Sequence, residues 1–224
     1  MVLRPPLAER FAIEGPAGAL QTLLEIPRTA AGAAPERVPA FGVVCHPHPL
    51  HGGTLDNKVV YTLARAFQQL GAPALRFNFR GVGASAGSYA QGEGELEDAR
   101  AVIAWGRQRF PGAPLWLGGF SFGGAVAALA AGETDPARVV LVAPGVRTLD
   151  IRTAAAPACP WLIVQGDADE VVPAAEVLEW ARGLAPPPEV TVLPGAGHLF
   201  HGRINELREA VLAFLNAAET AGSR

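Results

Sequence analysis

Short, continuous apolar runs recur along the chain and alternate with longer segments of helical periodicity. A strand that is apolar at every position is buried on both faces, as it is in a parallel sheet covered by helices. The expected strands are Arg10–Ile13, Leu20–Ile26, Phe41–Cys45, Ala74–Phe79, Leu115–Phe120, Val139–Ala143, Trp161–Gln165 and Val190–Leu193. This order predicts an α/β fold, with a doubly wound, mostly parallel eight-stranded sheet flanked by helices.

Five helices are expected around these strands, and Asp56 stands where it would cap the first of them. The expected helical segments are an apolar stripe from Val59 to Leu70, Glu95–Arg109, Phe122–Ala131, Pro173–Leu184 and a stripe from Ile204 to Leu215. In such a fold, ligands bind at the carboxyl ends of the strands, so the chemistry is expected there.

Length and composition limit the classes of protein to consider. Half of the 224 residues are hydrophobic, which predicts a single domain over residues 1–224 with a sizeable core. The net charge of −3 offers no basic surface for nucleic acid. No apolar run reaches the roughly 18–20 residues of a membrane span, and the N-terminus has no apolar signal-peptide core. We therefore expect a cytoplasmic protein that binds neither nucleic acid nor membrane. The sequence leaves the oligomeric state open, a homodimer included.

A candidate nucleophile follows the apolar run LWLGGF, where the pattern G-x-S-x-G places Ser121 between a strand and a small-residue helix. Such a serine sits on a sharp turn that lifts its hydroxyl above the sheet. The turn crowds the positions two before and two after it, and Gly119 and Gly123 have no Cβ to clash there. The start of the next helix then points its N–H groups toward a developing oxyanion.

Three segments together resemble the α/β-hydrolase superfamily: HPHPLHGGTLDNKVV, RFNFRGVGASAG and GGFSFGG. They are most similar to small bacterial members without a cap domain, which are described mostly as serine hydrolases or esterases. The resemblance covers nearly the whole chain. It implies a Ser-His-Asp triad in which the acid and the histidine follow the serine in that order along the chain.

The resemblance also implies which acid and which histidine complete the triad. Asp169 matches the acid of the pattern G-x-x-D-x-x-V-P, while Asp167 is the alternative, otherwise a loop residue that binds backbone N–H groups. His198 matches the histidine of G-x-G-H, and His201 is the competing position. Glu170 is expected to be a solvated loop charge.

The histidine-rich segment HPHPLH follows the third strand, where this superfamily places the second oxyanion donor. Pro47 and Pro49 have no N–H, so the nearest donors are those of His48 and Leu50. By resemblance, the backbone N–H groups of His48 and Phe122 form the oxyanion hole, and His46 braces the loop. A zinc site is the alternative, but the segment lacks a matching Asp or Cys, so we expect neither metal nor cofactor.

The segment from Pro144 to Pro160, where lids of this superfamily are inserted, is too short to form one. The site should therefore be open. Its expected rim is Leu50, Val146, Leu149, Val171, Leu199 and Phe200. The sequence predicts a serine hydrolase, a carboxylesterase acting on small acyl esters with water. The alternatives are a thioesterase or acyl-peptide hydrolase with the same triad, or a non-catalytic ligand-binding protein with this fold.

Overall fold

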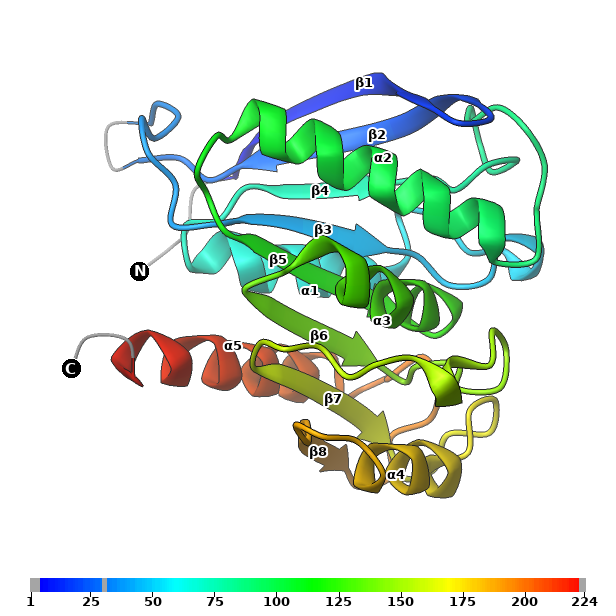
Figure 1. The fold of residues 1–224 in the computed structure, drawn as a ribbon. Helices are drawn as coiled ribbons and strands as arrows, with labels where there is room; N and C mark the ends of the chain where they lie inside the picture. The colour runs from blue at the N-terminus through cyan, green and yellow to red at the C-terminus, as the bar shows by residue number, and fades with distance from the viewer. Residues whose placement is uncertain (1–4, 30–31, 222–224) are drawn as a thin grey trace.

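Eight strands pair into one sheet in the computed structural model, which describes residues 5–29 and 32–221. The sheet has the order β1-β2-β4-β3-β5-β6-β7-β8 (Figure 1). Only the pairings of β2 with β1 and with β4 are antiparallel, and the rest are parallel. The strands are β1 (Leu7–Gly15), β2 (Gly18–Ile26), β3 (Phe41–Cys45), β4 (Ala74–Phe77), β5 (Leu115–Phe120), β6 (Arg138–Val142), β7 (Trp161–Gly166) and β8 (Glu189–Leu193). The predicted fold class is confirmed.

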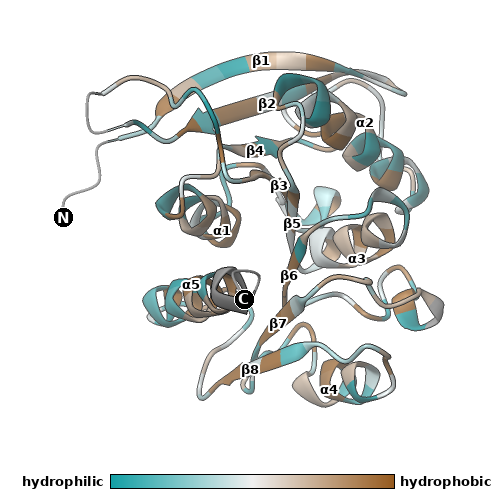
Figure 2. Ribbon diagram, turned by 60° about the vertical axis from the view of Figure 1, so that its left-hand side comes forward, coloured by the Kyte–Doolittle hydropathy of each residue, from teal (hydrophilic) through white to brown (hydrophobic). Residues whose placement is uncertain are grey.

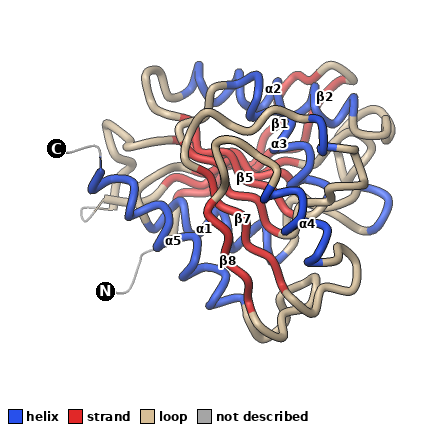
Figure 3. The backbone as a smooth tube through the Cα atoms, turned by 60° about the horizontal axis from the view of Figure 1, so that its bottom comes forward, coloured by secondary structure: helices blue, strands red, loops and turns tan. Residues whose placement is uncertain are grey.

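Five α-helices cover the two faces of this sheet, α1 and α5 on one and α2, α3 and α4 on the other (Figure 2). Their bounds are α1 (Lys58–Gln69), α2 (Glu93–Arg109), α3 (Phe122–Thr134), α4 (Ala174–Arg182) and α5 (Ile204–Ala221). Every residue of β3, β4, β5 and β7 is buried, which explains why the sequence shows them as unbroken apolar runs. Figure 3 shows the strands enclosed between the helices.

The first helix begins differently from the expectation. Its cap is Asn57, whose side-chain oxygen accepts hydrogen bonds from the N–H groups of Val59 and Val60 at 2.9 and 3.4 Å. Asp56 is one residue too early for that geometry, and its carboxylate lies 3.5 Å from the Arg76 guanidinium instead. Both are good capping residue types, so the position of the first helical turn decides between them.

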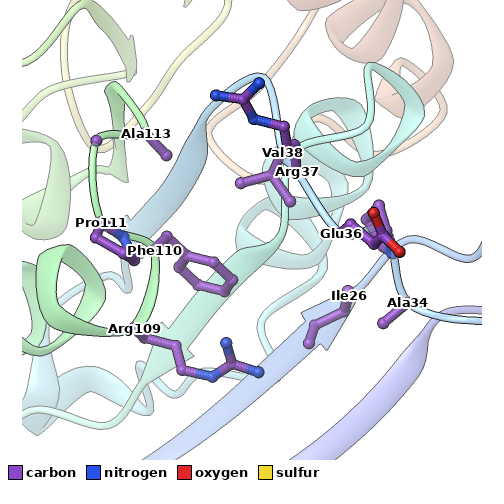
Figure 4. Close-up of a pocket in the computed structure, with 11 residues that line it drawn as sticks. Ile26, Ala34, Glu36, Arg37, Val38, Arg109, Phe110, Pro111 and Ala113 are labelled. Carbon is purple, nitrogen blue, oxygen red and sulfur yellow. The ribbon is translucent and has the colours of Figure 1, made fainter.

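The segment before β3 forms one side of a pocket at the opposite end of the sheet from the expected site (Figure 4). Glu36 and Val38 face Arg109 and Phe110 at the end of α2 across a volume of about 360 Å³. Because β3 begins at Phe41, this pocket lies at the amino edge of the parallel strands. In the described part of the chain, no helix is long and apolar enough to cross a bilayer.

Candidate active site

Ser121 occupies the turn between β5 and α3 in a strained backbone conformation, with φ 57° and ψ −119°. A positive φ is uncommon for a residue with a Cβ and persists only where its surroundings fix it. Here the Ser121 N–H donates to the carbonyl of Val142, and its carbonyl accepts from the N–H groups of Ala125 and Gly145. The turn lies at the carboxyl edge of the sheet, toward which the parallel arrows point in Figure 1.

The two glycines that flank Ser121 allow its turn to pack closely. A Cβ on Gly119 would lie 2.1 Å from the carbonyl oxygen of Gly123. A Cβ on Gly123 would lie 2.3 Å from the carbonyl oxygen of His46 and 2.4 Å from that of Cys45. These obstacles are backbone atoms that cannot move aside as a flexible side chain would. Both glycines of the motif are therefore required by sterics.

A continuous chain of hydrogen bonds joins Ser121, His198 and Asp169. The Ser121 Oγ lies 3.0 Å from His198 Nε2, and His198 Nδ1 lies 2.9 Å from Asp169 Oδ2. The ionised carboxylate only accepts, so Nδ1 carries the imidazole proton and Nε2 is free to accept from the serine hydroxyl. All three residues are less than 10% exposed. Three loops at one sheet edge thus bring together the three residues that the sequence singles out.

Asp169 is held in its ionised form by hydrogen bonds. Burial favours the neutral acid, but the hydrogen bonds from His198 and from the N–H groups of Val172 and Val171 outweigh it and lower the pKa of Asp169 below its usual value. The two N–H groups bind Oδ1 at 2.7 and 2.9 Å. A fixed negative charge therefore faces the imidazole.

Two backbone N–H groups beside Ser121 remain free of protein partners. Phe122 is the first residue of α3, where an N–H has no partner within the helix. Leu50 donates its N–H to His48 Nδ1 at 3.2 Å, so of the two expected donors the His48 N–H is the free one. In the described residues, neither the His48 nor the Phe122 N–H makes a hydrogen bond. The ring centroids of His48 and Phe122 lie 5.0 Å apart, which places the two residues side by side.

Comparisons with known proteins agree with this geometry. A family model described as the alpha/beta hydrolase fold matches residues 50–157. An α/β serine hydrolase without lid from Xanthomonas campestris is 37% identical with a TM-score of 0.88, over 97% of each chain. The chain belongs to the α/β serine hydrolases without a lid.

Two further relatives extend this family. An alpha-beta serine hydrolase homologue from Coxiella burnetii is 44% identical to this hydrolase, with a TM-score of 0.84, over 92% of this chain and 96% of the other. An uncharacterized protein of Rickettsia prowazekii is 34% identical over 185 residues, which are 78% of each chain.

The rim of the hydrolase's site is apolar but differs in part from the expectation. Leu50, Val171 and Leu199 are 67%, 61% and 44% exposed, each in a loop that carries a residue of the site. Val146 and Phe200 were expected at this rim, but both are buried in the core, at 2% and 0% exposure. Phe200 adopts a positive φ of 51°, in the turn that follows His198. Leu149 is half-buried.

The competing carboxylates and histidine take other positions. Asp167 accepts a hydrogen bond from the Gly195 N–H at 2.6 Å, the loop role expected of it. His201 is exposed, in the turn before α5. Glu170 was expected to be only a solvated charge, but its carboxylate accepts from the His198 N–H at 3.3 Å and so supports the histidine's loop.

His46 uses both ring nitrogens within the protein. Nε2 accepts from the Phe79 N–H at 3.0 Å, so Nδ1 carries the proton and donates to the Pro47 carbonyl at 2.6 Å. The side chain thus joins the loop after β3 to the end of β4, the bracing role expected of it. Within the described ranges, no group of three His, Cys, Asp or Glu residues is arranged to hold a metal ion.

One polar residue near the site is not evident from the sequence alone. Gln165, at the end of β7, is fully buried and donates a hydrogen bond to Asp169 Oδ2 at 3.2 Å. The available signal was a single polar side chain closing the apolar run WLIVQ at a carboxyl strand end.

Proposed function

We propose that this hydrolase is a serine carboxylesterase that cleaves small acyl esters through an acyl-enzyme. The observation that carries the proposal is the unbroken hydrogen-bond chain from Ser121 through His198 to Asp169, on a strained strand-to-helix turn. A serine that only stabilised a turn would not require a histidine whose Nε2 can accept its proton. It would also not require a buried carboxylate bound to the other ring nitrogen.

In the proposed acylation step, Ser121 Oγ attacks the ester carbonyl carbon while His198 Nε2 takes the hydroxyl proton. The carbonyl oxygen becomes an oxyanion, which the N–H groups of His48 and Phe122 stabilise. The N-terminus of α3 adds its positive dipole end to the same position. The tetrahedral intermediate then collapses, the C–O bond to the alcohol breaks, and the His198 imidazolium protonates the leaving alcohol.

Deacylation repeats these steps with water as the nucleophile. His198 removes a proton from water, the resulting hydroxide attacks the acyl carbon, and the proton returns to Ser121 as the acid departs. Asp169 keeps the imidazole in one tautomer and stabilises its charged form throughout. The proposed steps use no metal ion or cofactor.

The decisive experiment combines labelling with substitution. An organophosphonate should modify the protein at one residue, Ser121, as mapped by mass spectrometry. Ser121→Ala should lower ester hydrolysis by about 10⁴-fold or more and leave the thermal transition nearly unchanged. A label on another residue, or an active Ser121→Ala variant, would reject the proposal.

The triad alone does not distinguish an ester from a thioester or an amide. A matched panel with one acyl group and three leaving groups would separate them. We expect the highest kcat/KM for the oxygen ester. A higher value for the thioester or the amide would redirect the proposal to a thioesterase or an acyl-peptide hydrolase.

A further inference from the structure

Gln165 donates a hydrogen bond to one carboxylate oxygen of the candidate acid, and the backbone donors bind the other. Its Nε2 lies 3.2 Å from Asp169 Oδ2, and 3.1 Å from the carbonyl oxygens of Gly166 and of Val172. The backbone donors Val171 and Val172 bind the other carboxylate oxygen, Oδ1. Among the described residues, only His198 and Gln165 donate to Oδ2, the oxygen nearer to His198 Nδ1.

The orientation of the Gln165 amide is determined by its neighbours. All three groups around Nε2 are acceptors, so exchanging the amide oxygen and nitrogen would place a carbonyl against three oxygens. The amide therefore points its NH₂ group at Asp169. Its own Oε1 is buried and has no hydrogen-bond partner in the described structure. A buried acceptor without a protein partner is destabilising, so it is the NH₂ group, and not the oxygen, that fixes the orientation of this amide.

We propose that Gln165 is a positioning residue of this hydrolase, which fixes the rotation of the Asp169 carboxylate so that Oδ2 faces His198. The inference rests on the proposed function, since it assigns Asp169 as the acid of the triad. Two backbone donors hold Oδ1, and the Gln165 amide holds Oδ2, so the carboxylate cannot turn about its Cβ–Cγ bond. His198 then meets the same acceptor oxygen through the whole cycle.

The two other carboxylates near Asp169 bind backbone N–H groups. Asp167 accepts from the Gly195 N–H, and Glu170 accepts from the His198 N–H. Neither carboxylate replaces the amide of Gln165 as a donor, because ionised carboxylates only accept. Loss of the Gln165 side-chain amide should therefore act directly on Asp169.

Gln165→Met tests this inference, and Gln68→Met is its matched control. Gln68 is also buried, and its Nε2 also donates to a buried carboxylate at 3.2 Å, that of Glu25, far from the site. With p-nitrophenyl acetate, Gln165→Met should lower kcat roughly ten- to hundredfold with little change in KM. Gln68→Met should keep kcat within about twofold even if its melting temperature falls. Rates are taken per site labelled by phosphonate, so unfolded protein is not counted.

The pH profile separates positioning from simple stability. Without the amide, the carboxylate is a stronger base and holds the imidazolium proton more tightly, so the acid limb of kcat/KM should move to higher pH. A structural role alone would leave this limb in place. Wild-type kcat and an unmoved limb in Gln165→Met would overturn the inference, as would equal losses in both variants.

Two additional measurements keep the test decisive. If Gln165→Met does not fold, Gln165→Glu keeps the side-chain length. Its ionised carboxylate no longer donates to Asp169 and adds a second negative charge, so the acid limb of kcat/KM should again move to higher pH. An unmoved limb would overturn the inference. If wild type shows neither turnover nor labelling, the proposed function fails separately. The His198 Nδ1–H proton resonance then reports positioning, and it should shift in Gln165→Met but not in Gln68→Met. An unshifted signal would count against Gln165.

Discussion

Asp169 and Asp167 are two residues apart in one loop, yet the structure gives them different partners. Asp169 binds His198 and two backbone N–H groups, whereas Asp167 binds the Gly195 N–H. Asp169→Asn should lower kcat by roughly three to four orders of magnitude, because an amide no longer enforces the required imidazole tautomer. Asp167→Asn keeps the acceptor oxygen for Gly195, so kcat should stay within about threefold. Steady-state kinetics of both variants test this, and similar losses would move the acid to Asp167.

His46 makes stability depend on pH. Burial lowers the pKa of His46 to about 4, although its hydrogen bond to the Pro47 carbonyl partly offsets this effect. In the unfolded chain the pKa is about 6.5, so between these values the unfolded state binds a proton that the folded state does not. The contribution of His46 to the free energy of unfolding is therefore fully present above about pH 6.5. It is lost as the pH falls toward 4, a decline on the order of 3 kcal/mol.

Urea unfolding at pH 7 and pH 5 measures this decline. His46→Leu should be less stable at pH 7, because the Phe79 N–H loses its acceptor, but its stability should change less between the two pH values. Replacing the exposed His201 with glutamine is the matched control, and the decline should persist there. An unchanged decline in His46→Leu would disprove the role of this imidazole.

A residue of the candidate site can be predicted from the sequence where a reactive side chain stands in a short motif that also indicates its backbone conformation. Ser121 between its glycines and His198 after a strand have this property. Gln165 does not, because its importance depends on three acceptors that only the folded loop brings within reach. The backbone contact of Glu170 is of the same kind.

At the scale of elements, two of the three glycines of helix α3 have opposite requirements. A Cβ on Gly123 would collide with the carbonyl oxygens of His46 and Cys45, whereas a Cβ on Gly132 would meet nothing within 4 Å. Gly123→Ala should destabilise the fold by about 3 kcal/mol or more, since backbone atoms must move. Gly132→Ala should stabilise it by up to about 1 kcal/mol, because alanine is the better helix former. Urea unfolding measures both, and equal effects would contradict the packing argument.

The buried parallel strands were predicted closely, because burial on both faces leaves an unbroken apolar run. The ends of other elements depend on distant partners. β1 extends over Leu7–Gly15 rather than Arg10–Ile13, because it pairs with β2 along its whole length although most of its side chains are not buried. β4 ends at Phe77 rather than Phe79, because the Phe79 N–H turns to His46.

At the scale of the whole molecule, the two edges of the sheet have different roles. The carboxyl edge carries Ser121, Asp169 and His198, while the pocket of about 360 Å³ beside Phe110 lies at the amino edge. The sequence predicts that the candidate site lies at the carboxyl edge, because the loops that follow parallel strands all leave the sheet at that edge. It also predicts Leu50, Val171 and Leu199 at the rim, where they are exposed. It does not predict the burial of Phe200, which adopts a positive φ.

The carboxyl edge of the sheet determines which acyl chain length the proposed esterase should prefer. The segment between β6 and β7 forms only a short 3₁₀ turn at 151–153, and the family relative from Xanthomonas campestris also has no lid. The exposed apolar surface around the site includes Leu50, Val171 and Leu199, each at least 44% exposed. A methylene contributes about 0.8 kcal/mol when buried, so only the first carbons of an acyl chain gain from such a rim.

We therefore expect kcat/KM for p-nitrophenyl esters to be highest at acyl chains of roughly two to six carbons, and to level off or fall beyond them. No increase should occur above the solubility limit of the substrate, because residues 5–29 and 32–221 form no lid for an oil–water interface to open. A chain-length series measured on both sides of that limit tests both statements. Leu50→Ser and Val171→Ser should flatten the rise over the first carbons, whereas replacing the exposed Val192 of β8 should not. A maximum at long chains, or activation by an interface, would mean that a second copy of the chain or a moving loop encloses the substrate.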